Sequence, residues 1–474
     1  MDFSWGLLTD LGIISIALLV ATALRARVGF FQRFLIPNAL TAGFLLLPFY
    51  NFLAPLLELS TEGLGELVYH LLSVSFVAIT LRRTELKGAN SGYEVPQTSV
   101  AVLFQYGLQG FIGLLLTALL IGTIFPDLFP SFGLFVPLGF ALGPGQAFAI
   151  GRGWETFGFA GAGTVGLTFA AIGFLIASFG GVFLVNYGYR RGWLEASHGA
   201  RAERRSARRG VVARDEEAPV GSRLTTVSEA VESMSINLGL VLAVYLVSYL
   251  LLRLITYLLG LAGELGTDLA VNLWGINFVF ATITALGVKR ALRMLKVEHV
   301  LDGATLTRIS GMSVDVMVAA AVGAISLVVV GQYWLPIVIV AVGVGTLVMI
   351  TVPWTASRLF RSHRFERTLI VFGGMTGTLP TGLALLRILD PDFDTPVARD
   401  YIFASAVIFV LAIPMILAIN LPAYSVTRDN PLLFWLTVAI VGAYVLGSAL
   451  AYARIARRRA FAQPGRLWFS DSSR

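Results

Sequence analysis

The sequence predicts an all-α integral membrane protein made of two inverted halves. Three observations predict this class: a high apolar content, repeated apolar runs of membrane-spanning length, and two interrupted runs at matching places in the two halves. Of the 474 residues, 56% are hydrophobic and 13% are charged, and the mean hydropathy is +0.79. This composition is typical of a chain whose surface contacts lipid.

Apolar runs that could cross the hydrocarbon core as helices, which takes about 20 residues, occur along the whole chain. The expected spans are residues 3–24, 35–54, 64–81, 98–125, 160–187, 233–260, 268–287, 313–331, 334–353, 401–421 and 432–453, which makes about 11 transmembrane helices. The first run has no basic leader and no obvious small-residue cleavage site, which favours a retained helix over a signal peptide.

Basic residues gather in alternate connections, which are expected to face the cytoplasm. The longest of these, residues 190–223, carries nine arginines. The opposite connections, around Glu58, Asp127 and Glu264, contain no Lys or Arg. The other basic clusters are Arg25, Arg27 and Arg33; Arg82, Arg83 and Lys87; Lys289, Arg290, Arg293 and Lys296; Arg358, Arg361, Arg364 and Arg367; and the tail from Arg454. The predicted topology is multi-pass in the inner (plasma) membrane, with the N-terminus outside and the C-terminus cytoplasmic.

Two apolar runs, residues 132–158 and 367–391, are interrupted by Gly and Pro near their middle. If either crossed the membrane, every later basic connection would lie on the wrong side, so both are predicted to enter and return. Each leg has about 11 residues and reaches roughly halfway through the hydrocarbon at about 1.5 Å per residue. The alternative is that Gly and Pro only kink ordinary spanning helices.

The two halves then repeat in opposite orientation. Residues 1–187 and 233–421 each read as four helices, a re-entrant hairpin and a fifth helix, joined by a basic cytoplasmic linker, residues 188–232. Residues 422–474 add one further helix and a basic tail. Inverted repeats with broken helices at equivalent positions are typical of secondary transporters whose substrate site lies near the midplane.

Several function classes lack their sequence signals. The basic residues form no stripe interleaved with stacking aromatics, so no nucleic-acid partner is expected. The chain has no cysteine, which excludes disulfides, thiolate nucleophiles and thiolate metal sites. The absence of a phosphate-binding loop disfavours ATP-driven transport, and the absence of HExxH and GxSxG motifs disfavours an enzyme; no cofactor is predicted besides Na+ as the coupling ion. The favoured function is that of a carrier, which is not an enzyme. The alternatives are a membrane-embedded enzyme and a channel or scaffold subunit.

The tips of the two interrupted runs carry the candidate ligands. Gly and Pro release carbonyl and N–H groups from the helix, and such groups bind Na+ and carboxylates when they line a protein cavity. The predicted substrate ligands are Gly143, Pro144, Gly145, Gln146, Arg152, Thr378, Pro380, Thr381 and Arg387, and the predicted Na+ ligands are Thr376, Gly377 and Thr378. Packing through small residues is the alternative, and it is favoured for Gly161, Gly163, Thr164, Gly166 and Thr168.

Charged residues inside the interrupted runs are costly and therefore candidates for function. Arg152 and Glu155 fall in the return leg of the first run and Arg387 in that of the second. One of the arginines is predicted to contact an anionic substrate, because a guanidinium matches a carboxylate; snorkelling to the interface is the alternative. Asp315, expected near the inner end of its helix, could bind Na+ or cap the helix.

Four sequences resemble the bacterial sodium/glutamate symporter family. They are Gly-Pro-Gly-Gln-Ala at 143–147 followed by Trp154 and Glu155, the stretches 161–168 and 373–382, and Pro-Asn-Ala-Leu-Thr-Ala-Gly at 37–43. The resemblance covers roughly residues 1–421; the His-Gly-Thr stretch usual at the family's first tip is absent here. It implies a ten-helix inverted-repeat core, Na+ as the coupling ion, symport of glutamate or a related amino acid or organic anion, a homodimer and elevator-like alternating access.

Overall fold

The structure, a computed structural model, describes residues 5–34, 36–82, 94–193, 210–211, 222, 224–227, 229–261, 263, 270, 273–390 and 395–469. All regular elements within these residues are helical, so the all-α prediction is confirmed. Most of the predicted linker 188–232, together with Arg83, Lys87 and Glu264, lies outside the described residues.

The helices follow the apolar runs. In the first half they are α1 (Gly6–Arg27), α2 (Gly29–Arg33), α3 (Asn38–Pro48), α4 (Glu62–Leu81), α5 (Glu94–Thr123), α6 (Pro144–Glu155), α7 (Ala162–Leu175) and α8 (Gly181–Arg190). In the second half they are α10 (Ser233–Gly260), α12 (Asn277–Met294), α13 (Gly303–Gly323), α14 (Leu327–Leu359), α15 (Arg364–Leu386), α16 (Val397–Ala418), α17 (Leu421–Thr427) and α18 (Leu432–Ala456). Short π or 3-10 turns are η1 (Phe49–Leu53), η2 (Ala54–Leu57), η3 (Phe132–Leu134), η4 (Pro137–Leu142), η5 (Ile176–Gly180), η7 (Glu298–Val300) and η8 (Arg457–Arg459).

The described part of the chain contains ten helical stretches long and apolar enough to cross a membrane. This makes the chain a multi-pass membrane protein by the length and composition of its helices. Nine of the ten overlap predicted spans, and the tenth, α15, is the second of the two interrupted runs. The predicted spans 268–287 and 401–421 are not among the ten, although α12 and α16 lie over most of their residues.

The predicted span 313–331 had the wrong limits. Helix α13 begins ten residues earlier, at Gly303, because Asp302 caps it by accepting a hydrogen bond from the N–H of Thr305. The chain leaves the helix before Ser326, which caps α14. Asp315 therefore lies in the middle of α13 rather than near its inner end, so of the two alternatives given for it, capping of the helix is wrong.

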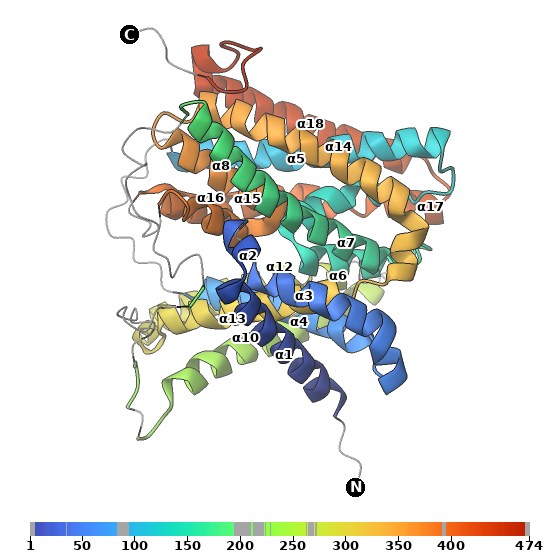
Figure 1. Cartoon of the computed structure of the whole chain (residues 1–474). Helices are drawn as coiled ribbons and strands as arrows, with labels where there is room; N and C mark the ends of the chain where they lie inside the picture. Colours follow the sequence, from blue (N-terminus) through green and yellow to red (C-terminus); the bar gives the residue numbers. More distant parts are fainter. Residues whose placement is uncertain are drawn as a thin grey trace.

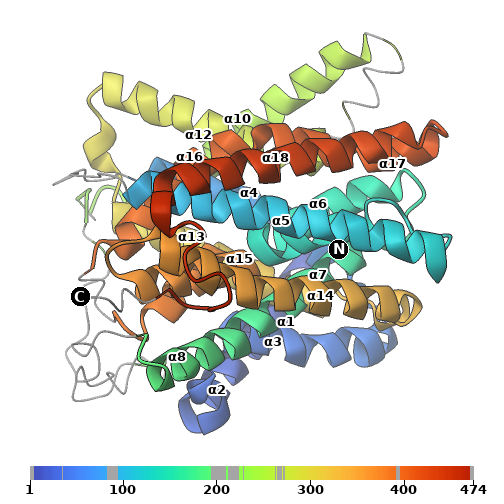
Figure 2. The same cartoon turned by 90° about the horizontal axis from the view of Figure 1, so that it is seen from above.

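The helices form two groups, one above the other in Figure 1 and seen again from above in Figure 2. The first group consists of α1, α3, α4, α10, α12 and α13, and the second of α5, α6, α7, α8, α14, α15, α16 and α18. Each half of the sequence supplies helices to both groups. The groups meet where α6 packs on α4 and α13 and where α7 contacts α13.

The basic connection between α14 and α15 is only partly solvated. Arg358 and Arg367 were predicted to be connection cations, but both side chains are buried. Arg367 forms an ion pair of 2.7 Å with Asp400 on α16. Arg358 is covered by the segment 460–469, which folds back after α18, and Trp468 of this segment stacks on Trp193 at 4.8 Å between ring centroids.

Candidate functional site

The first broken segment, residues 132–155, folds back on itself at Gly143. Its incoming leg is η3 and η4, and its return leg is α6. Gly143 has φ +99° and ψ −178°, a conformation that essentially only glycine adopts, and Pro144 starts α6. The rings of Phe135 and Trp154 lie 4.8 Å apart and hold the two legs together.

The second broken segment is α15, which is two helices joined at Gly377 and Thr378. Neither residue is helical, and Thr378 has φ +72°. The two legs pack closely: a Cβ on Gly373 would lie 2.7 Å from Cα of Gly382. Glycine at both positions is therefore required for the legs to approach.

The two tips touch one another. A Cβ on Gly143 would lie 2.6 Å from Cγ2 of Thr378, so the loop of the first segment rests directly on the loop of the second. The junction of α7 with η5 lies alongside: a Cβ on Gly173 would approach the carbonyl oxygen of Thr376 to 2.5 Å, and one on Gly377 would lie 2.9 Å from Cβ of Ala177. Segments more than 200 residues apart in sequence thus converge at one place.

Backbone groups dominate the chemistry of this place. The usual helical partner of the Phe140 carbonyl would be the N–H of residue 144, and that of the Thr376 carbonyl the N–H of residue 380; both residues are proline and have none. The return legs begin here, so their N-terminal ends bring partial positive charge to the same point. Such a site offers carbonyl oxygens to a cation and N–H groups to an anion.

Buried amides and a hydroxyl surround the tips. Gln109 of α5 donates from Nε2 to the carbonyl of Met375, 2.9 Å away, in the incoming leg of α15. Its Oε1, Oε1 of Gln146 and Oγ of Ser178 are buried and have no hydrogen-bond partner among the described residues. Sequence reasoning included Gln146 but missed Gln109 and Ser178. A Gln inside an apolar span is a usable signal, because burying an amide without a partner is costly.

The predicted site residues separate into two sets. The structure brings one set to the tips: Gly143, Pro144, Gly145, Gln146, Thr376, Gly377, Thr378, Pro380 and Thr381. It leaves Arg152 and Arg387 at the far ends of the return legs, each about 12 Å from its tip at about 1.5 Å per residue. Both are exposed, and Arg152 pairs with Glu155 at 2.5 Å.

Helix α7 crosses α6 through its small residues, as predicted. A Cβ on Gly166 would lie 2.5 Å from the carbonyl oxygen of Ala147, and one on Gly163 would lie 3.1 Å from the ring of Phe148. The packing prediction for these glycines is confirmed, and it explains how α6 is held against α7 with its tip at the site.

Within the described residues no three His, Asp or Glu side chains gather as a metal-binding group. A cation at the tips would therefore be held by backbone and hydroxyl oxygens, the ligands that hard cations prefer. Comparison of the chain with protein-family models, curated proteins and solved structures found no match.

Proposed function

We propose that this chain is a sodium-coupled secondary transporter, a symporter of glutamate or a related amino acid or organic anion. The observation that carries the proposal is the contact between the two broken segments at Gly143 and Thr378. Two helix breaks in a membrane protein expose backbone groups that lipid cannot satisfy, so such breaks are kept where they are buried in protein or line a water-filled cavity, and solute sites are built at such places. The two breaks come from different halves of the chain, as transport folds with internal repeats require.

Reciprocal helix contacts support an inverted repeat. In the repeat, α3 corresponds to α12, α4 to α13, α5 to α14 and α7 to α16. Helix α3 packs on α13 while α12 packs on α4, and α7 packs on α14 while α16 packs on α5. A pseudo-two-fold axis produces this exchange of partners. The two broken segments would then be re-entrant hairpins entered from opposite sides.

Two helix groups that meet through a limited set of helices suit elevator-like alternating access. In this proposal the second group carries both tips and moves against the first, as the resemblance to the sodium/glutamate symporters implies. Basic residues at the ends of α1, α8, α12 and α18 favour one face as cytoplasmic, with the N-terminus outside and the C-terminus inside an inner (plasma) membrane. A homodimer is part of the same proposal.

Ligand roles follow from the chemistry of the tips. We assign Na+ to the break at Thr376, Gly377 and Thr378, where carbonyl and hydroxyl oxygens gather. The carboxylate of the substrate is assigned to the N-terminal ends of the return legs, at Gly145 and Gln146 in one segment and at Thr381 in the other. The sequence-based proposal of an arginine contact would need Arg152 or Arg387 to move toward the tips.

Uptake into proteoliposomes tests the proposal. Radiolabelled glutamate, aspartate and other carboxylates are offered with an inward Na+ gradient or with K+, for the unaltered protein, Thr378→Ala and Thr307→Ala. Thr307 is the matched control, because it is an exposed helical threonine of α13 whose hydroxyl bonds only its own helix. We expect Na+-driven accumulation that Thr378→Ala weakens at least tenfold and that Thr307→Ala leaves unchanged. Equal uptake by all three proteins would show that the tips are not part of the transport site.

A further inference from the structure

A basic recess lies at the end of α12, away from the tips. It is a shallow, largely open depression of about 470 Å³ along one helix, lined by Leu286, Gly287, Lys289, Arg290 and Arg293 of α12. Gly287 borders this open space, since a Cβ at this position would meet no atom within 4 Å. The recess thus combines apolar walls with three cationic side chains at one end.

The outer face of α12 changes from apolar to basic toward this recess. Ile283 and Leu286 are 50% and 53% exposed, and Arg290 follows on the same face because residues three, four and seven positions apart align on a helix. From Ile283 to Arg290 the helix rises about 10 Å. The opposite face, with Phe278 and Ala285, is buried. An apolar stripe that ends in cations matches the upper acyl chains and the phosphate of a phospholipid.

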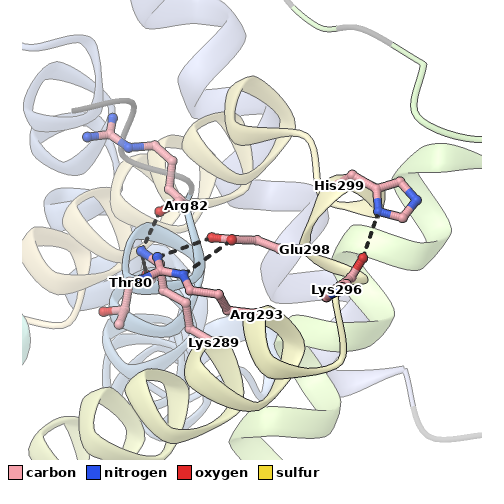
Figure 3. Close-up of polar contacts among 7 residues, drawn as sticks. All are labelled: Thr80, Arg82, Lys289, Arg293, Lys296, Glu298 and His299. Atoms are coloured by element: carbon pink, nitrogen blue, oxygen red, sulfur yellow. Dashed lines mark hydrogen bonds and ion pairs between the residues drawn. The ribbon is translucent and has the colours of Figure 1, made fainter. Parts of the chain in front are cut away.

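Among the residues that the structure describes, the positive charge of this region is only weakly compensated. Figure 3 shows Lys289 donating to the backbone oxygens of Thr80 and Arg82, at 3.0 and 2.6 Å, which fastens α12 to the end of α4. Arg293 reaches Glu298, the one acid in this view, at 3.4 Å, and the Arg293 side chain is 68% exposed. Carbonyl oxygens hold Lys289 in place without cancelling its charge, so the recess stays electropositive.

We propose that this recess binds the headgroup of an anionic phospholipid, with the phosphate at Lys289, Arg290 and Arg293 and the acyl chains along Ile283 and Leu286. Basic side chains clustered at the cytoplasmic end of a membrane helix attract such headgroups. The usual cytoplasmic excess of basic residues needs neither a recess nor an adjoining apolar stripe, whereas a lipid site needs both. The inference depends on the membrane location of the chain and not on transport, so a failure of the uptake experiment would not contradict it.

Native mass spectrometry of the full-length protein in detergent tests the proposal. Phosphatidylglycerol and phosphatidylcholine with the same acyl chains are titrated against the unaltered protein and against the double variant Arg290→Gln/Arg293→Gln. We expect phosphatidylglycerol to bind at least tenfold more tightly than phosphatidylcholine. We expect the double variant to weaken its binding about thirtyfold, at about fivefold for each basic side chain near an anionic headgroup.

The matched control is Arg454→Gln/Arg458→Gln, which removes the same charge from exposed positions near the end of α18. Equal loss in both double variants would mean diffuse charge attraction and would overturn the proposal. Gly287→Leu keeps every charge, fills the recess and favours the helix, so it should weaken binding about tenfold while the fold persists. Unchanged binding by Gly287→Leu contradicts the site. Displacement of the lipid by glycerol phosphate at equal concentration would show a site for a soluble phosphate instead.

Discussion

The segment after α18 should be released when Arg358 loses its guanidinium. Arg358 is 0% exposed, and its hydrogen-bond partners among the described residues include no carboxylate. Its Nε donates to Ala462 at 3.0 Å, and its Nη2 donates to Gln463 at 2.7 Å and to Arg466 at 2.9 Å, in each case to the backbone oxygen. Three carbonyls of the segment thus depend on one side chain. The perturbation is Arg358→Met, which keeps most of the apolar volume and removes all three donors.

The magnitude follows from those three hydrogen bonds. A hydrogen bond to a charged group contributes about 1.5–3 kcal/mol, and these three bonds are part-buried, so their loss should destabilise the docked segment by at least about 3 kcal/mol. Undocking restores water to the carbonyls, and the docking equilibrium should therefore fall by at least about 100-fold. The remaining contacts, such as the bond from Nε1 of Trp354 to the carbonyl of Pro464 at 3.2 Å, also act on the docked state only.

Limited trypsin digestion measures this equilibrium. Cleavage after Arg466 requires local release of the segment, and its rate tracks the released population when closing is faster than cleavage. We expect the rate to rise by about two orders of magnitude in Arg358→Met. Arg361→Met is the control, because Arg361 is an exposed neighbour on the same connection. A rate within threefold of the unaltered protein, or an equal rise in the control, would refute the reasoning.

Three further substitutions test the second helix group. Gly143→Ala places a Cβ where φ is +99°, at a cost of about 1–3 kcal/mol, and should abolish Na+-dependent uptake; uptake at the normal rate would count against the tip geometry. Arg367→Met should lower stability by about 3–5 kcal/mol, because it removes the 2.7 Å partner of the buried Asp400 and leaves Arg399, at 3.8 Å, as its remaining ion-pair partner among the described residues; adding Asp400→Leu should recover part of the loss in thermal melts, and no recovery contradicts this. Trp154→Phe removes the 2.8 Å bond to Asn420 and should cost about 1–2 kcal/mol, whereas an unchanged melting temperature would show the bond to be neutral.

Hydropathy and the positions of Gly and Pro predicted much of this fold, because lipid requires long apolar helices and every break in them stands out. The limits of α13 were mispredicted for the same reason. Its buried face contains Thr305, Ser310 and Ser313, which lower the hydropathy of a segment that is nevertheless inside the protein. The break before Ser326 lies in an apolar stretch, so hydropathy gave no sign of it; only the capping serine did.

Charge clustering predicts which connections share a face, but it cannot tell a solvated arginine from a buried one. Arg358 and Arg361 are three residues apart in one basic cluster, yet the first is enclosed and the second exposed. The difference arises because Arg358 binds backbone oxygens about 100 residues further along the chain, and the local sequence around Arg358 does not predict this contact.

Sequence-based prediction of the candidate site has the same limit. Backbone breaks have a local cause, so Gly143 and Thr378 could be found from glycine and proline alone. Their contact has a distributed cause: Gly173 lets α7 approach the carbonyl of Thr376, and Gln109 holds the carbonyl of Met375 from a third helix. Each of these residues reads as ordinary packing or as an isolated polar residue in its own span. A site made of backbone groups therefore becomes visible only when the helices that press its two tips together are placed in space.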